Sequence, residues 1–393
     1  MTALLDSLPI ADAPRDARRL GAGATPGLRA WAMPDRAAGD RGASSRDEPD
    51  LQTEPVDPLV GAAWDRETQA FPEANFFHSS AWARVLQTSY GHRPCYFRLR
   101  RAGETVALVP VMEIRSRFTG IRGVSLPFSD ACGPLVAPTE DPASVTAHLL
   151  ALARRRGWKY LELRGIGVPA AVPPSLRFFG HRLDLTPGID QLWTNCSGAA
   201  RRGVNRARAA GLAARIARDT AAVDAFYGLH LRTRRRHGLP PQPRSFFRHL
   251  QREVLAPGKG FVVLVGDGQE PVAAALFVES SDTVLYKFGA SDPRALASRP
   301  NNLAIWAGIE AAAARHRTTL DFGRTSLQND GLRRFKRGWG TTESPLAYAR
   351  YHLASGQWIG QGDATSGVHT HVFRRLPLFA NRIAGTLLYP HLS

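Results

Sequence analysis

The sequence predicts an α/β protein of the α+β kind, in which two successive halves each carry a mixed, largely antiparallel sheet flanked by helices. Its 393 residues, 44% of them hydrophobic and 9% aromatic, are enough for two or three domains with sizeable cores. Segments with the period of a strand alternate along the chain with segments of helical period, and turn residues separate them. No internal repeat of fixed period accompanies this alternation.

Composition divides the chain into four parts. Residues 1–58 are rich in Ala, Arg, Asp, Gly and Pro without a sustained period, so we expect a disordered leader. An N-terminal domain is expected over residues 59–185 and a C-terminal domain over residues 186–355, joined by a connection dense in proline and glycine at 169–187. Residues 356–393 form a tail that contains an amphipathic helix.

The first half begins with a helix whose apolar residues recur at helical spacing after a capping serine. Two strands joined by an Ala-Gly turn follow, and then a third strand, a turn-rich segment, a second helix and a last strand. These elements are expected at 79–90, 94–101, 105–114, 123–128, 142–156 and 158–164.

The second half opens with a basic helix and then runs strand, two helices, three strands, helix, strand, helix and strand. Before the final basic helix, the elements are expected at 198–210, 212–217, 221–237, 244–255, 261–266, 271–279, 283–289, 301–316 and 319–322; the last strand is expected at 347–353.

The segment from Leu320 to Gly340 carries the most information about function. It predicts a short buried strand, a polar turn and a basic helix. This junction delivers a carboxylate, a guanidinium and an ammonium group to one place, from Asp321, Arg324 and Lys336. In open α/β sheets, ligands bind at the carboxyl ends of strands, so we expect a ligand site here.

Charge and cysteine usage narrow the class of protein. The formal net charge of +17 favours phosphate-rich partners, such as nucleic acid, nucleotide cofactors, lipid-linked phosphates or an anionic membrane. The three cysteines are widely spaced and have no histidine at metal-ligand spacing, which argues against a metal site or a disulfide framework. Without a signal segment or an apolar run of membrane length, we expect a cytoplasmic protein.

The order of elements in the second half is that of the GNAT acyltransferase fold, and several segments resemble the FemAB-like branch of that superfamily. This branch is related to peptidoglycan-bridge aminoacyl transferases and to acetyltransferases of exopolysaccharide clusters. The matching segments of the second half are RRGVNRARAAG (201–211), TRRRHGLP (233–240), YKFGA (286–290), NLAIW (302–306), DFGRT (321–325) and FKRGWG (335–340). Those of the first half are FHSSAW (77–82), YGHRP (90–94) and LPFSDACGPL (126–135).

The resemblance implies two tandem GNAT-like domains with the acceptor held in a cleft at their boundary. It implies an acyltransferase that moves an acyl group from acyl-CoA to an amine or hydroxyl of a cell-envelope glycan or peptidoglycan precursor. The partner would be a phosphate-bearing or lipid-linked glycan precursor. The alternative donor is aminoacyl-tRNA, and nucleic acid would be a partner only in that case.

Two departures from the family pattern favour the smaller thioester donor. No acidic residue follows shortly after Gly133-Pro134, and the chain has no room between His237 and Asn301 for the helical arm that engages transfer RNA in some relatives. The usual pyrophosphate loop of CoA-binding GNAT enzymes is also missing from 291–301, and its pattern occurs only at 18–23 and 357–362. The identity of the donor therefore stays open.

Two cations are carried over from the family's motifs. The resemblance places Lys336 beside the reacting groups, where it could stabilise the oxyanion or an acceptor phosphate. It places Arg236 on the acceptor's phosphates. The alternative is that the charges around Lys336 only solvate a helix face. Phe335 and Trp339, which flank this lysine in the motif, complete the expected binding surface.

The remaining candidates each have a structural alternative. Asp321 could act as a base or orient Arg324, but it could equally fasten the turn, and a neighbouring cation is expected to lower its pKa. Tyr286 and Asn302 bracket the place where a GNAT-like sheet separates to admit its donor. Tyr286 could donate a proton, although a tyrosine on a strand is more often part of the core. Cys132, in the turn-rich segment with Ser129 and Asp130, is expected to be a buried thiol and not a nucleophile.

The tail and two rival functions complete the expectations. Residues 372–392 place Leu376, Phe379, Ile383 and Leu387 on one helix face flanked by arginines. This face either rests on anionic lipid, which would make the protein peripheral to the inner membrane, or docks on its own domain; docking is favoured. The rivals are a nucleic-acid-binding protein, which the lack of aromatics among the arginines disfavours, and an inactive scaffold of a polysaccharide system.

Overall fold

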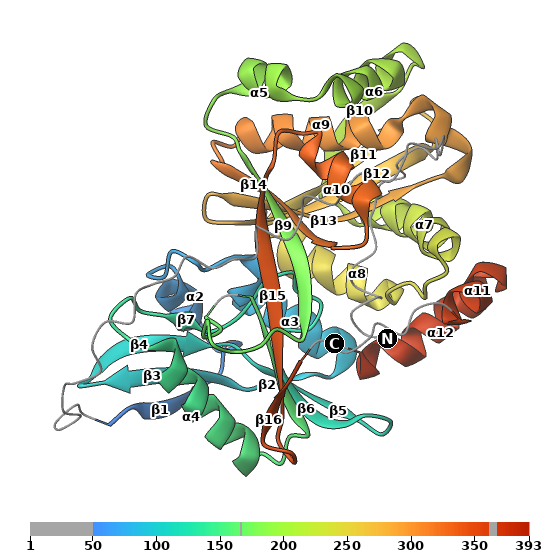
Figure 1. The fold of residues 1–393 in the computed structure, drawn as a ribbon. Coiled ribbons are helices and arrows are strands. Elements are labelled where there is room, and N and C mark those ends of the chain that lie inside the picture. Colours follow the sequence, from blue (N-terminus) through green and yellow to red (C-terminus); the bar gives the residue numbers. More distant parts are fainter. Residues whose placement is uncertain (1–49, 166, 361–367, 393) are drawn as a thin grey trace, which may run out of the picture.

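The computed structural model describes residues 50–392 apart from 166 and 361–367. Figure 1 shows the strands of the first half below those of the second half, with two long strands, β9 and β15, running between them. The helices of the second half lie on both sides of its strands.

The first half is mostly strands with three α-helices among its described residues. The α-helix α3 illustrates how local sequence sets the bounds: the Ser79 hydroxyl accepts a hydrogen bond from Trp82 N, and Gly91 ends the helix at a φ of 69°. The elements are β1 (Gln52–Val56), α2 (Ala63–Thr68), α3 (Ser80–Tyr90), β2 (Arg93–Pro94), β3 (Tyr96–Arg101), β4 (Glu104–Val109), β5 (Met112–Ser116), β6 (Gly120–Ser125), β7 (Leu135–Val136), α4 (Pro142–Arg155), β8 (Tyr160–Arg164) and β9 (Leu176–Asp184).

The second half follows the expected order and adds short elements. The elements of the second half are α5 (Ile189–Asn195), α6 (Gly198–Ala209), β10 (Ala213–Ala217), α7 (Thr220–His237), α8 (Arg244–Leu250), β11 (Gly260–Gly266), β12 (Pro271–Ser280), β13 (Thr283–Ser291), α9 (Pro300–Ala313), β14 (Thr319–Ser326), α10 (Asp330–Arg337), β15 (Thr342–His352), β16 (Gln357–Ile359), α11 (Val368–Arg375) and α12 (Leu378–Leu388).

One sheet extends through both halves. In the described part of the chain it has 12 strands, in the order β10-β11-β12-β13-β14-β9-β15-β8-β6-β5-β2 with β16 beside β15. Strand β15 pairs with β9 from Thr342 to Tyr348 and with β8 from Tyr348 to His352, so it enters the first half from the second. A separate sheet of the first half has the order β1-β3-β4-β7.

Three expectations need correction. The predicted leader of residues 1–58 ends too late, because Gln52–Val56 forms β1 and pairs with β3; residues 1–49 lie outside the described ones. The predicted connection at 169–187 contains β9, which bonds to β14 and β15. The apolar face predicted to dock the tail is instead exposed at Phe379, Ile383 and Leu387. The division of the chain into domains stays a prediction.

The sheet opens between β13 and β14. These parallel strands pair only from Thr283 with Thr319 to Leu285 with Asp321. On its other side β14 pairs with β9, with a register shift between Asp321 and Arg324. Gly323, at the shift, has a φ of 67°, and a Cβ there would lie 3.2 Å from the Asp130 carboxylate. A glycine is therefore required for both its conformation and the close approach of the first half.

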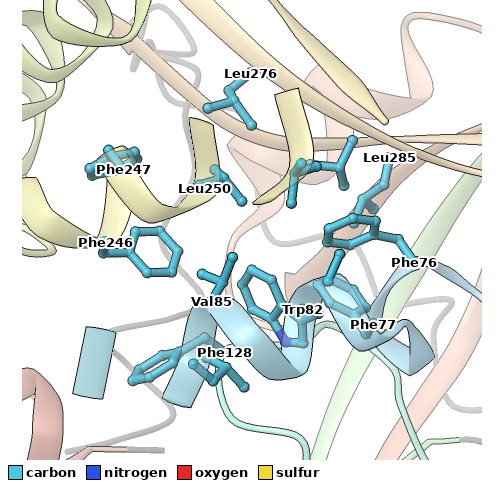
Figure 2. Close-up of a cluster of buried hydrophobic side chains, with 14 of the residues drawn as sticks. Phe76, Phe77, Trp82, Val85, Phe128, Phe246, Phe247, Leu250, Leu276 and Leu285 are labelled. Atoms are coloured by element: carbon cyan, nitrogen blue, oxygen red, sulfur yellow. The ribbon is translucent and has the colours of Figure 1, made fainter. Parts of the chain in front are cut away.

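One large hydrophobic cluster among the described residues contains side chains of both halves. Figure 2 shows Trp82 and Val85 of α3 facing Phe246 of α8, and Leu276 and Leu285 from the strands above them. The rings of Trp82 and Phe246 meet edge to face at a centroid distance of 6.0 Å. Because each such side chain contributes about 1.5–3 kcal/mol when fully buried, this cluster fixes the boundary at which the candidate site lies.

Candidate functional site at the boundary of the two halves

Lys336 is buried on the inner side of α10. The helix begins where the Asn329 side chain accepts a hydrogen bond from Leu332 N, and Leu332 and Lys336, one turn apart, both point inward. The ammonium donates to the carbonyl oxygens of Gly323 (3.0 Å) and Arg324 (2.8 Å). Burial lowers the pKa of Lys336 from its ordinary 10.5 to about 8, although nearby carboxylates oppose the change. Lys336 is therefore a cation held at the opening of the sheet, 4% exposed.

The first half supplies a carboxylate to this place, from Asp130. One oxygen lies 3.4 Å from Lys287 Nζ and the other 3.6 Å from Arg324 Nε. Burial opposes ionisation of Asp130, but the charges of Lys287, Arg324 and Lys336 prevail and hold its pKa below the ordinary value. From the sequence, Asp130 stood out only as a neighbour of Cys132, and its place in the site was missed.

The loop that carries Asp130 is fastened to the second half. Phe128 has a φ of 58°, a conformation that non-glycine residues rarely adopt. Its carbonyl oxygen accepts a hydrogen bond from Lys287 Nζ of β13 at 2.7 Å, and the same ammonium lies 4.8 Å from the centre of the Phe77 ring. The Tyr348 hydroxyl of β15 donates to the carbonyl oxygen of Asp130 at 2.7 Å. These contacts hold the turn in its strained conformation.

Asp321 fastens the turn of β14, as the structural alternative predicted. One oxygen accepts a hydrogen bond from Gly323 N at 2.7 Å, and the other lies 3.5 Å from Arg182 Nε. Burial raises the pKa of Asp321, so the expected fall beside a cation is wrong. Arg324 directs its guanidinium to the Tyr348 hydroxyl and to Asp130.

Tyr286 belongs to the core of the second half. Its ring lies 5.3 Å from that of Phe277 and 6.0 Å from that of Phe322, and burial raises its pKa. Arg236 is half-buried at the C-terminal end of α7, where its guanidinium lies 3.4 Å from His237 Nε2. These two residues are not among those that line the cavity described next.

A cavity of about 1200 Å³ lies between α6, α10 and the start of α9. The predicted residues Asn302, Phe335 and Trp339 line it. A Cβ on Gly203 of α6 would lie 2.6 Å from the Asn302 side chain, so the two helices approach closely at this wall. Phe335 of α10 and Trp339, two residues after the helix ends, thus line the cavity, whereas Lys336 points toward β14.

The lining of this cavity is strongly basic. Its six arginines are Arg202, Arg206, Arg299, Arg333, Arg334 and Arg337, against a single acidic residue, Asp330. Arg333 pairs with Glu343 at 2.6 Å, whereas no described carboxylate forms an ion pair with the other five. Arg299 begins α9 without a side-chain cap, so the positive end of this helix adds to the field. The wall is suited to a ligand with several phosphate groups.

No group of three or more His, Cys, Asp or Glu side chains that could hold a metal ion occurs within residues 50–392, apart from the segments that are not described. Within the same part of the chain, no helix is long and apolar enough to cross a membrane. Cys132 is buried, and burial raises its pKa, as expected of an unreactive thiol.

Comparison with known proteins confirms the expected fold. Residues 194–337 match the family model of the acetyltransferase (GNAT) domain. The structure of FemX is similar at a TM-score of 0.59 and 13% identity, with 75% of this chain and 96% of FemX covered. A tandem GNAT protein from the clavulanic acid biosynthesis pathway, solved without AcCoA, is similar at a TM-score of 0.51 and 10% identity, with 77% and 99% covered. No curated protein matches the sequence.

Proposed function

We propose that this chain, which carries a GNAT-type acyltransferase domain, moves an acyl group from acyl-CoA to an amine or hydroxyl of a cell-envelope glycan or peptidoglycan precursor. The observation that carries the donor assignment is the basic cavity between α6, α9 and α10. It supports a donor with several phosphates, and CoA has a pyrophosphate and a further ribose phosphate.

The arginines of the cavity give the proposal its energetics. Five of them have no carboxylate partner among the described residues, so a bound phosphate would not have to displace an internal ion pair. A hydrogen bond to a charged group contributes about 1.5–3 kcal/mol, which is roughly a 10- to 100-fold gain in affinity for each arginine that contacts the donor. Phe335 and Trp339 supply apolar wall for the rest of the molecule.

Lys336 is the proposed stabilising cation of the transfer step. An ammonium has three N–H donors, and two of them are used by the carbonyl oxygens of Gly323 and Arg324. No described residue accepts the third. Lys336 does not line the cavity itself, so we place the acyl end of the donor beyond Phe335, at the opening of the sheet. There the third N–H would bind the oxyanion that forms when the acceptor attacks the thioester carbon. That attack forms the bond between the acceptor's nitrogen or oxygen and the acyl carbon. When the tetrahedral intermediate collapses, the C–S bond breaks and CoA leaves as a thiol, with the proton that the acceptor gives up. Arg236 stays the predicted contact for acceptor phosphates.

The donor assignment is tested by calorimetric titration of the full chain with acetyl-CoA and CoA. The variant Arg202→Gln/Arg206→Gln is expected to lose about 100-fold or more in affinity, because two phosphate contacts are removed. The variant Arg66→Gln/Arg155→Gln changes the same number of exposed arginines on α2 and α4 and is expected to bind as the parent does.

Two results would refute the assignment. Unchanged CoA affinity in the α6 variant would remove the cavity from the donor site. Saturable binding of aminoacyl-tRNA without binding of CoA at millimolar concentration would favour the aminoacyl-tRNA-dependent alternative.

A further inference from the structure

The C-terminal helix α12 presents its large apolar side chains to solvent. Phe379, Ile383 and Leu387 follow one another at four-residue spacing and are 66%, 57% and 66% exposed. Such a stripe on a surface helix normally faces the core. Here the stripe faces outward, which is the reverse of the arrangement that would bury apolar area within the chain.

The opposite side of α12 is built for close docking. Asn381 and Gly385 are buried there, and a Cβ on Gly385 would lie 2.0 Å from the carbonyl oxygen of Pro241. The fully buried Tyr389 follows, and its hydroxyl accepts a hydrogen bond from Arg234 at 2.8 Å. Because only a glycine fits against Pro241, the helix cannot rotate to bury its apolar stripe without losing these contacts. The outward orientation is therefore imposed by the fold.

The exposed apolar surface continues onto the hairpin of β5 and β6. Phe118 at its tip is 82% exposed, and its ring lies 5.0 Å from that of His391, just after α12. We call the exposed apolar residues of this region the tail face: Phe118, Val372, Phe379, Ile383 and Leu387. In the described part of the chain, the other exposed large hydrophobic side chains are Val60, between β1 and α2, Ile216 of β10 and Ile359 of β16. A gathering of this kind marks an interaction surface.

The charges that the tail itself contributes are of one sign. Arg374, Arg375 and Arg382 are exposed beside it, and residues 367–393 contain no Asp or Glu. Exposed Arg117 adds a charge next to Phe118. In Figure 1, α11 and α12 form an outer flank of the molecule, away from the strands at the sheet opening. A second copy of this face would bring arginines against arginines, which disfavours a symmetric dimer through it.

We propose that the tail face inserts into the headgroup region of an anionic phospholipid bilayer. Apolar side chains on one side of a helix with arginines beside them are the arrangement by which interfacial helices bind anionic lipid. The apolar residues enter the boundary of the acyl chains while the arginines contact lipid phosphates. This binding is independent of the acyl donor, so its test and that of the donor site can fail separately.

The test is sedimentation of the full chain with vesicles of phosphatidylcholine alone or of phosphatidylcholine with phosphatidylglycerol at about 3:1. Salt is varied as well, because contacts between arginines and anionic headgroups weaken as the salt concentration rises. We expect strong binding to the anionic vesicles, weak binding to the neutral ones and a marked loss on raising the salt from about 0.1 to 0.5 M. The variant Phe379→Ser/Ile383→Ser/Leu387→Ser should bind about 1000-fold more weakly, since each of the three side chains contributes roughly a factor of ten.

Two further variants separate the contributions. Arg374→Gln/Arg375→Gln/Arg382→Gln should lose about 100-fold on anionic vesicles and little on neutral ones. The matched control Val60→Ser/Ile216→Ser/Ile359→Ser removes exposed apolar side chains elsewhere and should bind as the parent does. Because all nine positions are outside the core, circular dichroism melting curves should confirm that each variant is folded.

The proposal is overturned if the full chain does not sediment with anionic vesicles, or if the serine variant of α12 binds as tightly as the control variant. It is also overturned if analytical ultracentrifugation shows a dimer that the serine variant of α12 dissociates while no vesicle binding occurs. In that case the tail face is a contact between two copies of this chain.

Discussion

Replacing Lys336 with methionine should make the protein more stable at neutral pH while it abolishes acyl transfer. Methionine keeps most of the unbranched side chain that fills the space between α10 and β14 but has no ammonium group. Burial lowers the pKa of Lys336 from 10.5 to about 8, which means that the folded state disfavours the charged form. A buried, charged lysine in a site therefore lowers the free energy of unfolding, by an amount that follows from the pKa difference.

The pKa difference of about 2.5 units corresponds to about 3 kcal/mol of destabilisation below pH 8. The charge is already counted in the pKa difference, so the two hydrogen bonds to the carbonyls of Gly323 and Arg324 that methionine loses are those of a neutral amine, which contribute about 1 kcal/mol each. The balance is a gain of about 1 kcal/mol in the free energy of unfolding at pH 7. As the pH rises from about 8 toward 10.5, the folded lysine loses its proton before the unfolded one, so the parent recovers stability. The methionine variant should therefore lose its advantage across that range.

The assay is urea unfolding of parent and variant at several pH values from 7 to about 9.5, with thiol release from acyl-CoA measured in parallel. The half-exposed Lys259→Met serves as the control, and its effect on stability should be within about 0.5 kcal/mol. A Lys336→Met variant that is less stable than the parent by more than about 2 kcal/mol at pH 7 would refute this reasoning, because the charge would then be a net stabiliser. Full activity would remove Lys336 from the reaction.

Two further predictions concern the same boundary. Asp130→Asn should lower the free energy of unfolding by about 3–5 kcal/mol, because Lys287, Arg324 and Lys336 would remain close together without their carboxylate; a loss under 1 kcal/mol in urea unfolding would contradict the ion network. Burial, aided by repulsion from Lys336, lowers the pKa of His181 to about 4. Below about pH 6.5 the unfolded state therefore binds a proton that the folded state does not bind. The free energy of unfolding is expected to fall as the pH falls from about 6.5 toward 4. His181→Phe should flatten this decline by up to about 1.4 kcal/mol per pH unit, and an unchanged slope between pH 6.5 and 4.5 would show that His181 is not the cause.

Much of the fold could be predicted because its signals are local. The helices and strands of the second half have clear periods and turns, and their bounds agree with the structure to within a few residues, except that β15 begins at Thr342 and not near Ala347 as expected. Phe335 and Lys336 lie on the short helix α10 and Trp339 follows two residues after its end, so a single motif contains all three. What the motif could not tell is that the lysine points toward β14 while the two aromatic residues line the cavity beside α6, since that depends on contacts with β14 and α6.

The features that were missed depend on contacts between distant residues. Asp130 meets Lys287, 157 positions later, only because Phe128 adopts a left-handed conformation that its residue type does not announce. Strand β9 is surrounded by proline and glycine, and its partners β14 and β15 come much later in the chain. The apolar stripe on α12 was correctly identified, but it was expected to be buried and is exposed. Gly385 and Tyr389 determine which side of the helix docks.

The passage of β15 from one half into the other limits how this molecule can move. A hinge between the halves would have to break the ladder that β15 forms with β9 and then with β8, and the aromatic cluster around Trp82 would have to separate as well. We therefore expect the halves to unfold together in one cooperative transition. Entry and exit of substrates would be left to the helices and loops around the sheet opening, and either half produced alone would expose unpaired strand edges and aggregate.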